Sequence, residues 1–109
     1  MPKYVLAYHS NSGGPAEMPD SEEGMAAVMQ AWEAWFTSLG ENLVDGGNPI
    51  AFAKTLGSDG SVSDGGGSNP LTGYSLVQTD DIDAAVELAR GCPVLHNDGN
   101  VEVAEAIDM

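Results

Sequence analysis

Two histidines and several carboxylates are the residues of this chain whose types and spacing could do chemistry. His9 ends a short apolar segment, while His96 and Asp98 stand close together before the last apolar segment. A histidine beside a carboxylate can act as a general base near neutral pH. If the first and last segments pair as antiparallel strands, these three residues approach one another. We therefore take His9, His96 and Asp98 as candidate catalytic residues, with a plain surface role at the loop ends as the alternative.

Four further residues are candidates for binding a small molecule in a cleft. Glu102 alternates with two valines and shares its side of the segment with small alanines, which suits a carboxylate at a cleft rim. A structural hydrogen bond or a contact with a partner is the alternative for this carboxylate. Asp45 ends a predicted strand, although a turn with the glycines that follow is its alternative role. Tyr8 and Tyr74 complete the set, and an aromatic residue such as Tyr74 is also common in cores.

No metal or cofactor site is predicted. His9, His96 and Asp98 lack the tight spacing that is typical of metal ligands. The glycine-rich run at residues 64–67 has no helix directly after it and no Lys or Arg nearby, so we do not expect an anion-binding loop. Cys92 has no basic neighbour in the sequence that would lower its pKa, and we expect it to be a small packed residue.

The elements that must position these residues follow the order strand, helix, two strands, helix and strand. Strands are predicted at residues 3–9, 42–47, 73–79 and 101–107 from their apolar alternation and flanking turn residues. The first helix is expected to run from a cap at Asp20 or Ser21 to a stop at Gly40, and the second from a cap at Asp80 to a stop at Gly91. An additional hairpin is expected between them, with an extended segment at 50–56, a turn at 58–60 and a return strand from Val62.

Apolar stripes at helical spacing indicate that both predicted helices pack on a sheet. Arg90 is expected in the last turn of the second helix, where a cation complements the helix dipole. Because both sides of the segment at residues 3–9 are largely apolar, it is predicted to be an inner strand. The stripe of the first helix consists of Met25, Met29, Trp32, Phe36 and Leu39, and that of the second of Ile82, Ala85, Val86 and Ala89.

This order of elements predicts an α+β fold of the ferredoxin-like, split-βαβ type, βαββαβ, with an extra central hairpin. In such a fold the helices cover one face of the sheet. The other face must be covered as well, and a second copy of the chain would do this. We therefore expect a homodimer in which two sheets pack face to face.

Composition narrows the classes of partner. The chain has 109 residues, which predicts a single domain at 1–109. Its 17 acidic and 3 basic residues give a formal charge of −14, which argues against a nucleic-acid partner and an anionic membrane surface. A high-salt habitat or a cationic substrate would also fit this charge. A single cysteine, no signal peptide and no apolar run of membrane-spanning length predict a cytoplasmic location.

The chain resembles the YCII-related family, also called the DGPF-domain or YciI-like family. This resemblance implies a single YCII-related domain at 1–109, a dimeric α/β barrel and a homodimer. The Asp-Gly-Pro-Phe motif of the family reads Asp-Gly-Gly-Gly at residues 64–67, and the histidine that some members carry at the start of the first helix is absent here. The resemblance lies in the segments Tyr4-Val5-Leu6-Ala7-Tyr8, Leu43-Val44-Asp45-Gly46-Gly47, Asp64-Gly65, Gly73-Tyr74-Ser75-Leu76-Val77, Asp81-Ile82-Asp83-Ala84-Ala85, Cys92-Pro93 and Val101-Glu102-Val103.

Three functions are consistent with these features. The first is binding of a small molecule in a cleft at the interface of sheet and dimer. The second is a cofactor-independent enzyme of isomerase, lyase or hydrolase type that uses a His–carboxylate pair. The third is a regulatory or structural interaction protein. The sequence favours the first of these functions.

Overall fold

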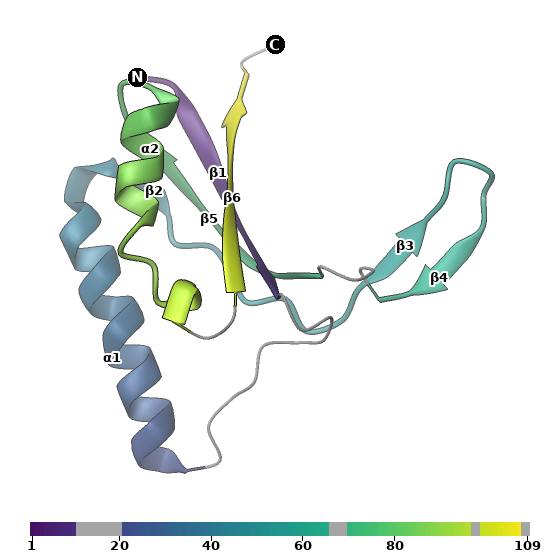
Figure 1. Cartoon of the computed structure of the whole chain (residues 1–109), viewed down its shortest axis with the longest axis horizontal. Coiled ribbons are helices and arrows are strands. Elements are labelled where there is room, and N and C mark those ends of the chain that lie inside the picture. Colours follow the sequence, from purple (N-terminus) through teal and green to yellow (C-terminus); the bar gives the residue numbers. More distant parts are fainter. Residues whose placement is uncertain (11–20, 66–69, 97–98, 108–109) are drawn as a thin grey trace.

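The chain folds into a four-stranded sheet, a separate hairpin and helices, so the predicted α+β class is confirmed (Figure 1). A computed structural model describes residues 1–10, 21–65, 70–96 and 99–107. The elements are, in order, β1 (Lys3–Ser10), α1 (Glu22–Leu39), the 3₁₀ turn η1 (Gly40–Asn42), β2 (Leu43–Asp45), β3 (Lys54–Leu56), β4 (Val62–Asp64), β5 (Leu71–Gln78), α2 (Ile82–Ala89), the 3₁₀ turn η2 (Pro93–His96) and β6 (Gly99–Ala106).

The main sheet has the strand order β2-β5-β1-β6, and all its neighbouring strands are antiparallel. β1 is therefore an inner strand, as its apolar faces predict. Its register places Tyr4 opposite Val77 of β5 and opposite Glu105 of β6. The pairing of β1 with β6 brings the first and last strands together, which confirms the arrangement expected for them.

The core lies between this sheet and the helices α1 and α2. Alternate residues of β1 point into it, and Tyr4, Leu6 and Tyr8 are almost completely buried. The ring of Tyr8 lies edge-on to Trp32 at 5.1 Å between centroids. Burial of each such side chain contributes about 1.5–3 kcal/mol to folding. Further buried members of the core are Trp35, Leu39, Val77, Ala85, Ala89, Cys92 and Val94.

The helix caps explain where the helices begin. Ser21 caps α1, because its hydroxyl accepts a hydrogen bond from the backbone N–H of Gly24 at 3.0 Å. Asp81 caps α2 in the same way, with Oδ1 accepting from the N–H of Ala84 at 2.7 Å. The predicted cap at Asp80 is therefore wrong by one residue, since two aspartates stand in tandem at this point. Asp20, the other predicted cap of α1, lies outside the described residues.

The predicted stripe of α1 is only partly correct. Trp35 and Leu39 are buried, yet Trp35 was not part of that stripe, and Met29 is 66% exposed. Figure 1 shows the reason, because the first half of α1 extends past the ends of β1 and β6 and so has no sheet to cover it. Within the described ranges, neither helix is long and apolar enough to cross a membrane.

The hairpin of β3 and β4 projects away from the sheet and the helices (Figure 1). Its turn at residues 58–60 is confirmed, since the N–H of Gly57 donates to the carbonyl of Ser61 at 2.7 Å. β3 takes up only Lys54–Leu56 of the extended segment predicted at 50–56, and before β3 the N–H of Ile50 donates to the carbonyl of Thr72 at 3.0 Å. Phe52 is 97% exposed beside the hairpin, so this region adds little to the core.

Candidate functional site

Every second side chain of each strand points to the face of the sheet that is turned away from α1 and α2. We call it the open face. Residues of β1, β5 and β6 that alternate with the core positions form it, and most of them are half-buried by their own neighbours. It combines small or aliphatic side chains with a few polar ones. Its members are Val5, Ala7, His9, Tyr74, Leu76, Glu102 and Ala104.

A histidine–carboxylate pair lies on this face. Nε2 of His9 is 3.2 Å from Oε1 of Glu102. The side chain of His9 is 17% exposed and that of Glu102 is 66% exposed. In the neutral ring with a proton on Nε2, the imidazole donates this proton to the carboxylate, which holds the ring in place. The pair therefore joins a largely buried imidazole to a carboxylate that water and ligands can reach.

The register of β1 and β6 produces this contact. His9 stands opposite Asn100, while Glu102 stands opposite Ala7. His9 and Glu102 are thus diagonal neighbours on one face of an antiparallel pair, within reach of long side chains. Both residues were candidates from the sequence, but their pairing was not predicted. The register of β1 against β6, once known, is the signal that identifies this pairing.

Tyr74 lies on the same face, on the other side of β1. Ala7 stands opposite both Tyr74 of β5 and Glu102 of β6, so a small side chain separates these two polar groups. The hydroxyl of Tyr74 accepts a hydrogen bond from Nδ2 of Asn48 at 3.3 Å. The phenol of Tyr74 and the carboxylate of Glu102 thus lie on either side of Ala7, and the imidazole of His9 lies on the same face.

Asp45 takes the turn role that was its alternative. Its Oδ1 accepts a hydrogen bond from the N–H of Gly47 at 2.8 Å. Gly47 has φ of 73°, and a Cβ at this position would lie 1.8 Å from the carbonyl oxygen of Tyr74. Only glycine fits at position 47. The hydrogen bond from its N–H to the carboxylate of Asp45 stabilises this tight turn beside β5.

Tyr8 faces the core rather than the open face, because consecutive strand residues point to opposite sides. Its hydroxyl donates to Oγ of Ser75 at 2.6 Å, and Oγ of Ser75 in turn donates to the carbonyl of Gly46 at 2.7 Å. Burial raises the pKa of the Tyr8 phenol above its ordinary value. Tyr8 therefore cannot share a ligand on the open face with its neighbour His9, and we assign it to the core.

The remaining catalytic candidates lie partly outside the described residues. His96 ends η2, and neither its side chain nor Asp98 is described. The predicted approach of these residues to His9 stays a prediction. The carboxylate that contacts His9 in the described part of the chain is that of Glu102.

Cys92 is buried, as its expected packing role requires. Burial raises the pKa of its thiol to about 12, so it is protonated at neutral pH and a poor nucleophile. No cluster of three or more His, Cys, Asp or Glu side chains within the described ranges is arranged to hold a metal ion. The chemistry available on the open face is hydrogen bonding and proton transfer by the His9–Glu102 pair.

Comparisons with known proteins add no family to this description. No protein-family model matches the chain, and a search of curated proteins finds no match. The resemblance to the YCII-related family therefore remains a prediction, carried by the segments quoted above. The case for a function depends on the open face and on the residues that form it.

Proposed function

We propose that this chain binds a small polar molecule on the open face of its sheet, with the His9–Glu102 pair as the polar anchor. The 3.2 Å contact between Nε2 and Oε1 is the observation that carries this proposal. A largely buried imidazole held by a carboxylate is oriented before a ligand arrives, which lowers the entropic cost of binding. The exposed carboxylate of Glu102 remains accessible to a hydrogen-bond donor.

A second copy of the chain completes the binding cleft in this proposal. The strand order β2-β5-β1-β6, antiparallel throughout, supports a ferredoxin-like domain of the dimeric α/β-barrel and YCII-related type. The aliphatic side chains of Val5 and Leu76 on the open face, with Val44 on β2, favour packing against another sheet. Two such faces in contact would enclose the polar group of each His9–Glu102 pair.

A cofactor-independent acid–base enzyme is the second candidate, and the same pair favours it. In this function His9 takes a proton from the bound molecule, and Glu102 stabilises the imidazolium that forms. Binding and catalysis are separated by His9→Gln, which keeps a hydrogen-bonding group but cannot move a proton. A binding protein retains most of its affinity in this variant, whereas an enzyme retains the ligand and loses turnover.

The binding proposal is tested with a metabolite library in a thermal-shift screen, followed by titration calorimetry of each hit. Glu102→Gln is compared with Glu105→Gln, a matched control on the same strand, where Glu105 stands opposite core residue Tyr4. We expect the Glu102 variant to bind about tenfold more weakly and the Glu105 variant to bind like the native chain. Equal affinities in all three proteins would overturn the proposal.

The dimer is tested separately by light scattering at micromolar concentration. We expect twice the 11.3 kDa mass of the chain. Val5→Lys, which places a charge at the centre of the open face, should return the protein to a monomer. A native protein with the mass of a single chain would refute the dimeric cleft.

A further inference from the structure

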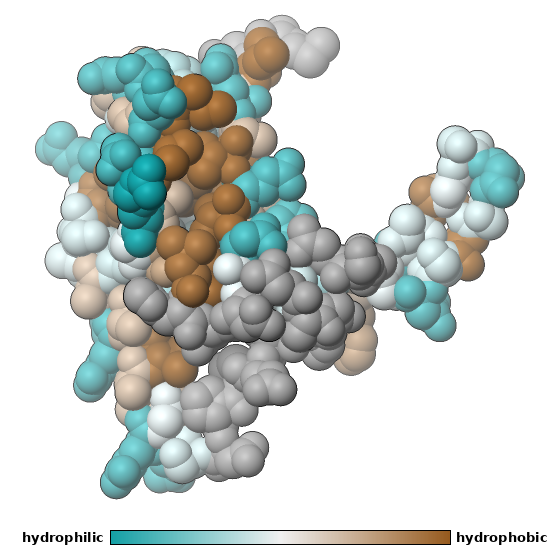
Figure 2. Space-filling view, viewed as in Figure 1, coloured by the Kyte–Doolittle hydropathy of each residue, from teal (hydrophilic) through white to brown (hydrophobic). Residues whose placement is uncertain are grey.

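A groove runs between α2 and β6, in the layer where the helices pack on the sheet. Its volume is about 350 Å³, and it is open to solvent along one side. Figure 2 shows a continuous apolar stripe on this side of the molecule, over the gap between the helix and the yellow strand of Figure 1. We call it the α2–β6 groove. It is lined by Val86, Ala89, Arg90, Leu95, Val101 and Val103.

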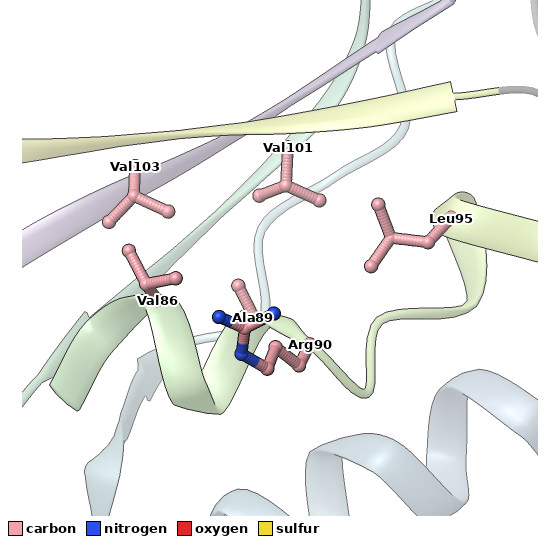
Figure 3. A pocket seen from close by; sticks show the side chains of 6 residues that line it. All are labelled: Val86, Ala89, Arg90, Leu95, Val101 and Val103. Atoms are coloured by element: carbon pink, nitrogen blue, oxygen red, sulfur yellow. The ribbon is translucent and has the colours of Figure 1, made fainter. Parts of the chain in front are cut away.

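The walls of the groove are aliphatic. Figure 3 shows Val101 and Val103 pointing from β6 toward α2, and Val86 pointing from α2 toward β6. Leu95 of η2 lies at one end of the groove. The described residues that line it include no aromatic ring, so a flexible aliphatic group fits these walls better than a planar ring. Its volume is at the small end of the range for ligand sites, about 300–1,000 Å³. The shape and lining therefore select a short aliphatic chain.

The groove is separate from the His9–Glu102 pair. Strand alternation turns Val101 and Val103 toward α2 and turns Glu102, between them, to the open face. A ligand in the groove thus touches neither His9 nor Glu102.

Arg90 is the charged residue among the described residues that line the groove. It is the only arginine of a chain with 3 basic and 17 acidic residues, and its side chain lies beside Ala89 in Figure 3. Nε of Arg90 donates to Oε1 of Glu87 at 3.0 Å. A guanidinium has five N–H donors in a planar fork, so its terminal nitrogens can still bind a carboxylate in bidentate fashion. Glu87 competes with such a ligand for the same cation.

We propose that the α2–β6 groove binds a short-chain aliphatic carboxylate. The hydrocarbon tail lies between Val86, Val101 and Val103, and the carboxylate pairs with the guanidinium of Arg90. Each CH₂ group that enters the groove should tighten binding about fourfold until the groove is full. A single cation beside aliphatic walls matches one negative charge on an aliphatic tail, which is the charge complementarity that selects this ligand.

The experiment is a methyl NMR titration of the full chain with sodium hexanoate at constant ionic strength. We expect saturating shifts of the Val86, Val101 and Val103 methyl groups, and weaker binding of butanoate. Arg90→Gln should weaken hexanoate binding about tenfold, and Glu87→Gln should tighten it. Lys54→Gln is the matched control, because it removes a cation of the projecting hairpin and should leave binding unchanged. Hexanamide, which has the same tail without the charge, should bind as weakly to the native chain as hexanoate binds to Arg90→Gln.

Several results would overturn the proposal. Equal binding of hexanoate by the native chain and by a folded Arg90→Gln would remove the role of the guanidinium. An equal loss in Lys54→Gln would indicate general electrostatic attraction. Shifts confined to the Val5 and Leu76 methyl groups would place the ligand on the open face, and unmoved methyl groups at millimolar hexanoate would exclude the site. A failure of the His9–Glu102 proposal would leave the groove shifts intact, so the two sites are tested independently.

Discussion

The two faces of β1 carry different kinds of residue. Toward the helices the strand presents large side chains, Tyr4 and Tyr8 among them, and on the open face it presents Val5, Ala7 and His9. Large rings fill the space under α1 and α2, where packing stabilises the fold. Small side chains around one histidine leave the opposite face accessible. The buried aromatic packing of β1 therefore lies on its covered face, and the proposed His9–Glu102 site lies on the open one.

Trp35→Ala should produce the largest effect on the covered face. The indole is 5% exposed, contacts the core rings and donates from Nε1 to the carbonyl of Leu88 at 3.0 Å. Its removal leaves a cavity and an unpaired carbonyl, so we expect the free energy of unfolding in urea to fall by about 3–5 kcal/mol. Phe52→Ala is the control, since Phe52 is 97% exposed, and should change stability by less than about 0.5 kcal/mol. Similar losses in both variants would contradict the division between core and surface.

Alkaline pH should lower the free energy of unfolding, because the thiol of Cys92 is buried in the core. Burial raises the pKa of this thiol from 9.0 to about 12, so between these values the unfolded chain loses a proton that the folded chain keeps. The stabilising contribution is complete below pH 9 and is lost as pH rises toward 12. We expect the unfolding free energy to fall by up to about 1.4 kcal/mol per pH unit from this group. Cys92→Ala should show a shallower alkaline decline in urea titrations at successive pH values, and an unchanged slope would count against a buried thiol.

A matched pair of tyrosines compares the two faces directly. Tyr8→Phe removes the buried hydrogen bond to Ser75 and should cost about 1 kcal/mol of unfolding free energy. Tyr74→Phe removes the partly exposed contact with Asn48 and should cost less than about 0.5 kcal/mol. Urea unfolding of both variants measures the difference. A larger loss of unfolding free energy in Tyr74→Phe than in Tyr8→Phe would contradict the view that Tyr8 lies on the face that stabilises the fold.

Glu102→Gln should have the smallest effect on stability and a clear effect on binding. A histidine–carboxylate contact with one exposed partner contributes about 0–1 kcal/mol, so we expect a change below about 0.5 kcal/mol in urea unfolding. The same variant should weaken ligand binding about tenfold, as proposed above. A large loss of stability without a change in binding would make Glu102 a structural residue.

Local patterns predicted the order of the elements well, because alternation and caps are encoded by neighbouring residues. The inner position of β1 and the turn at 58–60 followed from such patterns. The error at Met29 has another origin, since helical spacing does not tell how far α1 extends past the sheet. The shift from Asp80 to Asp81 arose where two residues offer the same capping group.

The candidate sites depend on information that a single segment does not contain. His9 and Glu102 are 93 positions apart, and only the register of β1 against β6 makes them neighbours. Alternation along β1 groups Tyr8 with Tyr4 and Leu6, but only the packing of the helices shows that this face of the strand is the covered one. Arg90 was predicted as a helix-end cation, but the groove beside it exists only once α2 packs on Val101 and Val103.

The central position of β1 also has a consequence for synthesis on the ribosome. Its strand neighbours, β5 and β6, are made long after it, so Tyr4, Leu6 and Tyr8 emerge well before any strand can pair with them. Pairing across almost the whole sequence is intrinsically slow, and waiting apolar segments are where aggregation begins. The nascent chain must therefore keep its first strand apart from other chains until translation has passed residue 106. The acidic residues that follow it in the sequence, from Glu17 onward, provide like-charge repulsion between neighbouring nascent chains during this interval.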